Sequence, residues 1–333
     1  MKKALAIFMT SVMCMFVLAA CGEKSQEDVI KSLEKKTENL KGYKTQATMV
    51  FHQGDKKQKY KAEISYKSSD FYKIVLDGGE QSNKQMIIKN DNGVFVLTPA
   101  LKKKYSFESK WPNNRSQYYL YQSLVTDILN DPEPDFETKD DQYVFTTATN
   151  YKTKELAHQK IVLNKDLEPK KVQIMDKDMN TVIDVSFNDF KFNPEFEKGT
   201  FDEDKAMSAA RIEKPTMANQ DKELTVVRPN LNWENTKLAL VKKVKNDDKV
   251  RHVIKYEGDR SFTLIESKSD VAETSSTVSA SGNPVDLGYA VGTITDGSLS
   301  WSYNGTDFYL ASDNLTQKEM IEVAGSMNSG LVK

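Results

Sequence analysis

The chain has 333 residues and is close to neutral, with 47 Lys and Arg against 48 Asp and Glu. This balance argues against the basic surface that nucleic-acid binding requires, so no nucleic-acid partner is expected. A chain of this length can bury a stable core without disulfides or structural metals.

The first twenty residues contain the segments of a secretory signal in their usual order. Lys2 and Lys3 form a positive head, and an uncharged apolar run follows over residues 4–20. This run is at the lower limit for spanning a bilayer, and charged sequence follows it at once. We therefore predict that residues 1–20 are a cleaved signal peptide. An uncleaved N-terminal helix is the alternative.

The segment Leu18-Ala19-Ala20-Cys21-Gly22 resembles the lipobox of bacterial lipoproteins. The resemblance implies that Cys21 becomes an N-palmitoyl and S-diacylglycerol cysteine, with residues 21–24 as the lipidated N-terminus. Two or three acyl chains hold a protein stably on a membrane, whereas one chain does so only marginally. We expect a lipid anchor on the extracytoplasmic face of the cell membrane. No free thiol then remains, because Cys14 leaves with the signal.

Residues 25–40 carry apolar side chains at helical spacing among Lys and Glu, which predicts a surface helix that Gly42 ends. A series of strand patterns follows, and Asn-, Asp- and Gly-rich turns such as residues 90–93 favour antiparallel hairpins between them. The predicted strands are residues 43–53, 58–66, 71–76, 85–89, 94–98 and 103–107.

A second apolar face at a period near 3.6 predicts a helix within residues 114–130, which the Asp-Pro-Glu-Pro segment 131–134 ends. Further strands are predicted at residues 143–149, 155–163, 171–175 and 181–187. Many short strands with two helices predict an α+β fold, a curved half-open antiparallel sheet with covering helices, over residues 25–200.

Residues 201–222 are charged and weakly patterned, and we interpret them as a linker to a second domain. Residues 223–333 are predicted to form a smaller C-terminal α+β domain. Its Ser- and Thr-rich residues 267–284 are predicted to be a mobile loop, and residues 316–327 a final amphipathic helix. The remaining strand patterns are residues 224–227, 237–244, 250–256, 261–266, 287–295, 299–303 and 308–310.

Residues 60–107 resemble the LolA-type carriers and the N-terminal half of RseB, through apolar strands around the Asn90-Asp91-Asn92-Gly93 turn. The segments Leu97-Thr98-Pro99 and Trp111-Pro112-Asn113-Asn114 are similar to a narrower family, the LolA-like lipoproteins of endospore-forming bacteria. That family includes sporulation proteins of the YdcC type, to which the chain looks close, and germination lipoproteins of the GerS type. The resemblance implies a LolA-like half-barrel and a role in sporulation or germination.

The resemblance also implies a concave sheet that binds a lipid, a lipoprotein acyl chain or an apolar segment of a partner. The candidate cavity residues are Met49, Phe51, Ile74, Phe95 and Leu97. Ordinary core packing is the competing interpretation of these side chains. A second hypothesis is an RseB-like sensor that regulates a membrane-protein partner.

Residues with catalytic or metal-binding chemistry are sparse. His52, His158 and His252 have no metal-spaced companions, and a calcium loop from Asp176 lacks the glycine and glutamate that such loops need. No catalytic motif occurs, so we expect no enzymatic activity, no cofactor and no metal; an envelope hydrolase is the enzyme-class alternative. The lysine run 102–104 is either a solvated hairpin tip or a contact to an anionic leaflet.

Overall fold

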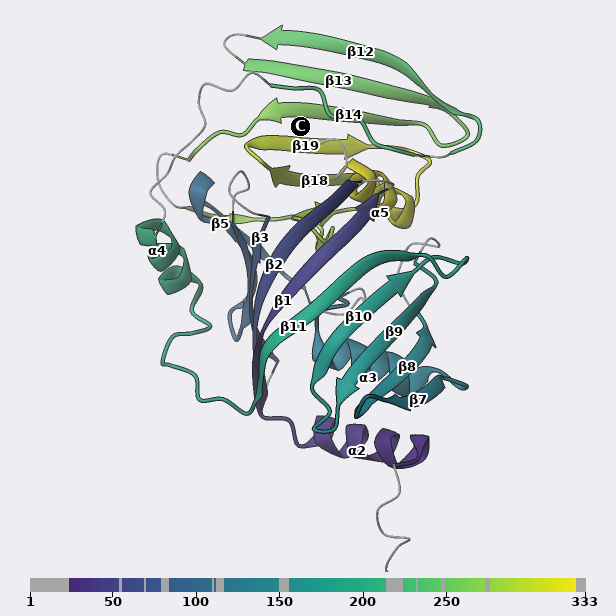
Figure 1. Cartoon of the computed structure of the whole chain (residues 1–333). Helices are drawn as coiled ribbons and strands as arrows, with labels where there is room; N and C mark the ends of the chain where they lie inside the picture. Colours follow the sequence, from purple (N-terminus) through teal and green to yellow (C-terminus); the bar gives the residue numbers. More distant parts are fainter. Residues whose placement is uncertain are drawn as a thin grey trace, which may run out of the picture.

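The computed structural model describes residues 24–53, 56–68, 70–78, 84–109, 111, 117–149, 156–213, 224–231, 233–246, 249–272 and 276–327. In this part of the chain, a large and a small β-sheet lie one above the other with four helices packed around them (Figure 1). None of these helices is long and apolar enough to cross a bilayer. The predicted α+β fold class, with a smaller second sheet, is confirmed.

The large sheet has twelve strands in the described residues, and all neighbours are antiparallel except β15 and β6, which are parallel. In spatial order the strands are β15 (Ser276–Ser279), β6 (Lys103–Phe107), β5 (Gly93–Thr98), β4 (Gln85–Asn90), β3 (Phe71–Asp77), β2 (Lys56–Lys67), β1 (Gly42–Gln53), β11 (Thr181–Phe192), β10 (Pro169–Met175), β9 (His158–Asn164), β8 (Gln142–Ala148) and β7 (Asp135–Lys139). The sheet curves around one helix, as the sequence predicts (Figure 1).

The predicted turn at residues 90–93 is confirmed as the β4–β5 hairpin, in which Asn90 pairs with Gly93. Gly93 has a φ of +130°, a backbone conformation that glycine adopts without steric cost. The alternation of apolar and polar residues also places side chains as expected. Along β3, buried and half-buried residues alternate, because successive side chains point to opposite faces.

Two helices lie on the concave side and at the lower end of the large sheet. α2 (Gln26–Glu38) begins at Ser25, whose side chain and that of Asp28 form a capping box. α3 (Tyr121–Asn130) lies inside the curve of the sheet. It is shorter than the predicted helix 114–130, because residues 117–120 form a turn; residues 112–116 lie outside the described part of the chain.

The segment predicted to be a linker contains a helix, α4 (Glu203–Glu213), on the outer face of the large sheet. Its Ala206 and Met207 are buried against Ile88 and Phe95. Asp202 accepts a hydrogen bond from the backbone N–H of Lys205 at 2.8 Å, which caps the first turn. Polar contacts also hold the helix, since Glu203 accepts a hydrogen bond from Asn90 and Asp204 pairs with Lys104. Two buried apolar side chains are too few to produce a helical pattern in a charged segment.

The small sheet has seven strands in the described residues and is antiparallel throughout. In spatial order the strands are β12 (Thr236–Asn246), β13 (Lys249–Gly258), β14 (Phe262–Lys268), β19 (Thr306–Ala311), β18 (Ser298–Tyr303), β17 (Val291–Ile294) and β16 (Asn283–Asp286). Its inner face carries α5 (Gln317–Ser326), which begins at a capping box formed by Thr316 and Glu319.

Two predictions in the C-terminal half are wrong. Residues 267–284 are not one loop, because they contain β15 and the start of β16. β15 pairs with β6 and thereby joins the edge of the large sheet. Residues 224–227 form no strand, since the backbone N–H of Val227 donates to the carboxylate of Glu266 instead of to a neighbouring strand.

The two sheets share one hydrophobic core. The buried cluster includes Met49 and Ile74 of the large sheet together with Trp301 and Leu310 of the small sheet. A separate, smaller cluster lies between the outer face of β4 and β5 and α4. The junction of the two sheets is therefore a packed interface, and any binding site there has a fixed shape.

Candidate functional site

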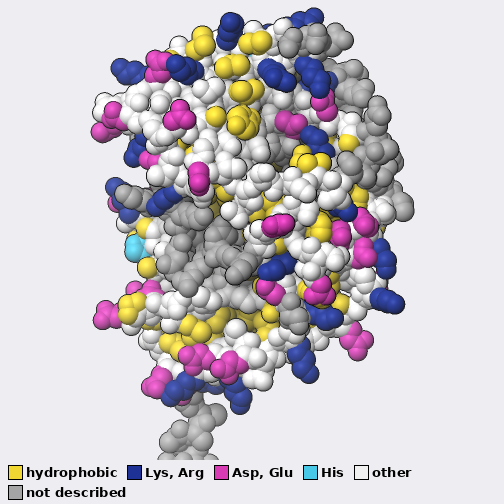
Figure 2. Space-filling model, turned by 180° about the vertical axis from the view of Figure 1, so that it is seen from behind, with side chains coloured by type: hydrophobic (Ala, Val, Ile, Leu, Met, Phe, Trp, Pro, Cys, Tyr) yellow, Lys and Arg dark blue, Asp and Glu magenta, His cyan; other side chains and the backbone are white. Residues whose placement is uncertain are grey.

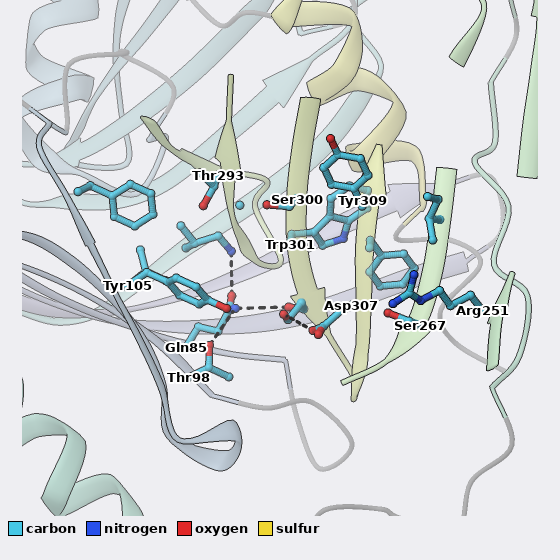
Figure 3. Close-up of a pocket in the computed structure, with 17 residues that line it drawn as sticks. Gln85, Thr98, Tyr105, Arg251, Ser267, Thr293, Ser300, Trp301, Asp307 and Tyr309 are labelled. Atoms are coloured by element: carbon cyan, nitrogen blue, oxygen red, sulfur yellow. Dashed lines mark hydrogen bonds between the residues drawn. The ribbon is translucent and has the colours of Figure 1, made fainter. Parts of the chain in front are cut away.

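A cleft of about 370 Å³ lies at the junction of the two sheets (Figure 3). β4, β5 and β6 form one wall, and β13, β14, β17, β18 and β19 form the other. Its lining residues are Gln85, Val96, Thr98, Tyr105, Phe107, Arg251, Ile265, Ser267, Val291, Gly292, Thr293, Ser300, Trp301, Ser302, Asp307, Phe308 and Tyr309. The lining combines aromatic rings with a few polar groups, as in ligand sites generally.

Gln85 connects the two walls of the cleft. Its side-chain oxygen accepts a hydrogen bond from the backbone N–H of Val291 at 2.8 Å, and its amide nitrogen donates to the carbonyl of Ser302 at 3.3 Å (Figure 3). The residue is buried, with 5% of its surface exposed. Because both partners are backbone groups of the small sheet, Gln85 fixes the position of that sheet on β4.

Asp307 anchors the other polar cluster of the cleft. Its carboxylate accepts hydrogen bonds from the hydroxyls of Ser302 and Ser269 at 2.5 and 2.6 Å, and it pairs with Lys103 Nζ at 3.0 Å. Lys103 belongs to β6 of the large sheet, so this ion pair also spans the junction. With three partners, the carboxylate acts as a structural contact and is poorly placed to transfer protons.

Arg251 and Tyr309 lie where the cleft opens onto the outer face of the small sheet. Tyr309 is 45% exposed, and Arg251 is exposed as well. Among the described residues, no carboxylate forms an ion pair with the Arg251 guanidinium. The mouth of the cleft therefore presents a cation and an aromatic ring to any bound group.

The loop after β16 packs into the concavity of the large sheet. Tyr119 donates a hydrogen bond to the Asp286 carboxylate, which also accepts from the backbone N–H of Gly288 at 2.7 Å. Burial raises the pKa of Asp286, although the two donated hydrogen bonds act in the opposite direction. Gly288 has a φ of +84°, and a Cβ there would lie 2.8 Å from Phe51 Cζ. The small sheet thus closes the upper end of the concavity.

The predicted cavity residues lie in three different environments. Met49 and Ile74 are fully buried in the shared core, and Phe51 is half-buried beside Tyr60, with ring centroids 5.3 Å apart. Phe95 and Leu97 belong to the cluster under α4, on the opposite face of the sheet. The structure therefore does not bring these five side chains together, and none of them lines the cleft. Cys21 lies outside the described residues.

Glu266 is a buried carboxyl group on the inner face of the small sheet, with none of its surface exposed. It accepts a hydrogen bond from Val227 N–H at 3.0 Å, and its Oε2 lies 3.7 Å from Nδ1 of the cross-strand residue His252. Burial raises the pKa of Glu266 to about 8, and the Val227 hydrogen bond opposes this shift. No motif in the sequence links these two residues.

Several other residues with catalytic or metal-binding chemistry have structural partners. His52 Nε2 lies 2.8 Å from the Asp184 carboxylate on the adjacent strand, and Asp176 accepts backbone N–H groups in a hairpin turn. Lys103 and Lys104 pair with Asp307 and Asp204, so neither is a solvated hairpin tip. Within the described part of the chain, no group of three His, Cys, Asp or Glu could hold a metal ion.

The cleft itself was missed because its two walls come from segments about 200 residues apart in sequence. Gln85 at the start of an apolar strand was one available signal, since a polar residue inside a core requires a partner. Nothing in the local pattern of Asp307 or Arg251 indicates that they line this cleft.

The sequence was compared with known families and proteins. A family model described as "Sporulation protein YdcC-like" matches residues 1–201. The sporulation protein YdcC of Bacillus subtilis (strain 168) is 40% identical over 328 residues, which cover 98% of this chain and 97% of the relative. These matches confirm the resemblance that the sequence motifs indicate.

Three solved structures also match the chain, all at low identity and low TM-score. A Pseudomonas aeruginosa MucA/MucB complex gives 12% identity and a TM-score of 0.31, covering 90% of this chain and 98% of that chain. A complex of the CwlD amidase from Clostridioides difficile with the GerS lipoprotein gives 17% identity and a TM-score of 0.24, covering 52% and 98%. A LolA superfamily protein from Nitrosomonas europaea gives 12% identity and a TM-score of 0.29, covering 53% of this chain and 98% of that chain. The family assignment follows from the two sequence matches alone: the chain belongs to the family of YdcC-like sporulation proteins.

Proposed function

We propose that this protein is a lipid-anchored, non-catalytic binding protein that acts in sporulation and receives a segment of a partner protein in its inter-sheet cleft. The observation that carries the proposal is the cleft itself, about 370 Å³ in volume and lined from both sheets by aromatic and polar side chains. Membership of the YdcC-like sporulation family supplies the biological setting.

The chemistry of the lining favours a polypeptide over a bare acyl chain. Thr98, Thr293 and Ser300 offer hydroxyls beside the rings of Tyr105 and Tyr309, so the site provides hydrogen bonds as well as apolar contact. An acyl chain has no group to use such hydroxyls, and leaving them unpaired on burial costs free energy. Met49 and Ile74, predicted for a lipid cavity, are already covered by the protein's own side chains.

The anchor is the second part of the proposal. Cys21 stands five residues before the first residue of α2, and a chain of that length spans roughly 17 Å when extended. Acyl chains on Cys21 would therefore hold the α2 end of the molecule close to the bilayer. The small sheet, which forms one wall of the cleft, lies at the opposite end in Figure 1, where a partner can reach it.

The proposal of a non-catalytic role rests on the side chains at the cleft. Asp307, the carboxylate that lines it, has three hydrogen-bonding or ionic partners, and no histidine or cysteine is among the lining residues. General acid–base or nucleophilic catalysis needs such a group free to meet a substrate.

The test is site-specific photocrosslinking in sporulating cells, with a photoreactive amino acid in place of Thr293 in the cleft. The matched control carries it in place of Met179, an exposed side chain in the β10–β11 turn. We expect a protein crosslink from Thr293 and none from Met179. Crosslinks to lipid alone, or equal yields at both positions, would reject a partner protein in the cleft; lipid crosslinks would favour the acyl-chain hypothesis.

A further inference from the structure

The outer face of the small sheet presents a row of apolar side chains that leads into the cleft. Strand register aligns Val253 of β13 with Ile265 of β14, and Ile265 with Tyr309 of β19. Tyr309 is opposite Ser300 of β18, which is opposite Thr293 of β17. The last four of these residues line the cleft, so the outer face and the cleft form one continuous surface.

This row is accessible to solvent. Val253 and Ile265 are half-buried, Tyr309 is 45% exposed, and Leu240 on the neighbouring row of the same face is 44% exposed. The opposite face is covered at β14, where Leu264 has none of its surface exposed, whereas Val241 on the edge strand β12 is 37% exposed on that face. Figure 2 shows hydrophobic side chains gathered over the small sheet, in the upper part of the molecule, with Lys and Arg beside them. An apolar surface rimmed by charge is typical of a protein interaction site.

Two basic side chains lie beside the row, and the acidic Asp307 on the same face is paired with Lys103. Lys242 is the cross-strand partner of Val253, and Arg251 lies on the adjacent row of the same face. In the described part of the chain, neither cation forms an ion pair with a carboxylate, whereas Lys249 and Lys255 pair with Asp270 and Glu257. Two unpaired cations beside an apolar row complement a partner with acidic and apolar side chains.

We propose that this face binds an acidic segment of a partner protein, which rests on the proposed function and specifies the partner's chemistry. The partner's apolar side chains cover Val253, Ile265 and Tyr309, and its carboxylates pair with Lys242 and Arg251. A membrane is the weaker match, because β12 and β13 lie at the end of the molecule away from α2, which the anchor on Cys21 holds near the bilayer (Figure 1).

The probe is a displayed library of random linear peptides, selected on the full-length protein extracted from membranes in detergent. We expect the enriched peptides to combine Asp or Glu with apolar residues and to bind more weakly as salt rises. The double variant Lys242→Glu/Arg251→Glu should weaken their binding by roughly tenfold or more, because attraction becomes repulsion. Tyr309→Ser should weaken it by roughly threefold or more.

The matched control is Lys139→Glu/Lys177→Glu, which makes the same charge change at exposed positions of the large sheet. It should leave peptide binding unchanged. If the Glu double variant unfolds, the variant Lys242→Gln/Arg251→Gln replaces it. The salt dependence of peptide binding to the unchanged protein also tests whether the two cations attract acidic peptides.

Enriched peptides without an excess of acidic residues, or peptides that bind the Glu double variant equally well, would overturn this inference. Peptides that still crosslink to position 293 in that case would leave the proposed function intact. A library that yields no binding peptide would count against both. Vesicles offer a further outcome. If phosphatidylglycerol vesicles displace the bound peptides and the same amount of phosphatidylcholine vesicles does not, Lys242 and Arg251 bind an anionic membrane instead.

Discussion

The side-chain oxygen of Gln85 on β4 accepts a hydrogen bond from the backbone N–H of Val291 on β17, at 2.8 Å and across 206 positions of sequence. This bond joins the two sheets directly beside the cleft. The hydrogen bond therefore helps to fix the position of the small sheet on the large sheet.

Replacement of Gln85 should destabilise the protein. Gln85→Ala leaves the buried N–H of Val291 without its acceptor, and an unsatisfied buried donor costs about 1–3 kcal/mol. Urea unfolding should therefore show a lower free energy of unfolding. The control is Gln46→Ala on an exposed position of β1, where a change within about 0.5 kcal/mol is expected. Equal effects of the two substitutions would show that the Gln85 bond contributes nothing.

Stability should fall as the pH rises above the ordinary range of a glutamic acid. Burial raises the pKa of Glu266 to about 8 from a usual value of 4.5, so the folded protein holds a proton there that the unfolded chain releases. The contribution is fully present below about pH 4.5 and is lost as the pH rises to about 8, at up to about 1.4 kcal/mol per pH unit.

Urea unfolding from pH 5 to 9 measures this dependence. Glu266→Gln removes the titrating group and keeps an acceptor for Val227 N–H, so its stability should vary less with pH over the same range. If the two proteins lose stability in parallel, Glu266 is not the group responsible.

Gly288 should tolerate no side chain. Its φ of +84° is unfavourable for other residues, and an alanine Cβ would lie 2.7 Å from the Tyr118 hydroxyl and 2.8 Å from Phe51 Cζ. Gly288→Ala should lower the free energy of unfolding by about 1–3 kcal/mol.

Gly325→Ala in α5 is the matched control, since no atom lies within 4 Å of the added Cβ. Alanine favours the helix, so this variant should be as stable as the unchanged protein or more stable by up to about 1 kcal/mol. Differential scanning calorimetry compares the two variants. A Gly288→Ala protein of unchanged stability would contradict the packing of this loop against the large sheet.

The proposed lipid anchor predicts the intact mass of the mature protein. Protein extracted from membranes should begin at Cys21 and carry the added mass of a diacylglycerol and an N-acyl chain. Cys21→Ser should retain residues 1–20 and carry no acyl mass, because the hydroxyl does not accept the lipid. Cys14→Ser should match the unchanged protein. Intact-mass spectrometry distinguishes these products, and normal processing of Cys21→Ser would remove the basis for the anchor.

The hairpins of the large sheet could be predicted because their signals are local. Asn90 and Gly93 specify a turn whatever the rest of the chain does, and the caps at Ser25 and Thr316 specify where α2 and α5 begin. The helix α4 lacks such a pattern, since Ala206 and Met207 are its only side chains in the buried cluster of the described residues.

The cleft and β15 could not be predicted for a different reason. β15 is held by backbone pairing to β6, and its Val278 remains 50% exposed. Because β15 buries no apolar face, its sequence resembles that of a polar loop. The cleft depends on how two sheets are placed against each other. That placement depends on the shared core and on contacts such as Gln85 to Val291, which no spacing or periodicity reveals.

The parallel pairing of β15 with β6 has a consequence for the order of folding. The edge of the large sheet is completed by residues 276–279, which pair with residues 103–106 from a distant part of the chain. Closing so long a loop is slow, and until then β6 presents a free edge to other chains. A fragment truncated before β15 should therefore aggregate, and folding of the two sheets should be one late, cooperative event.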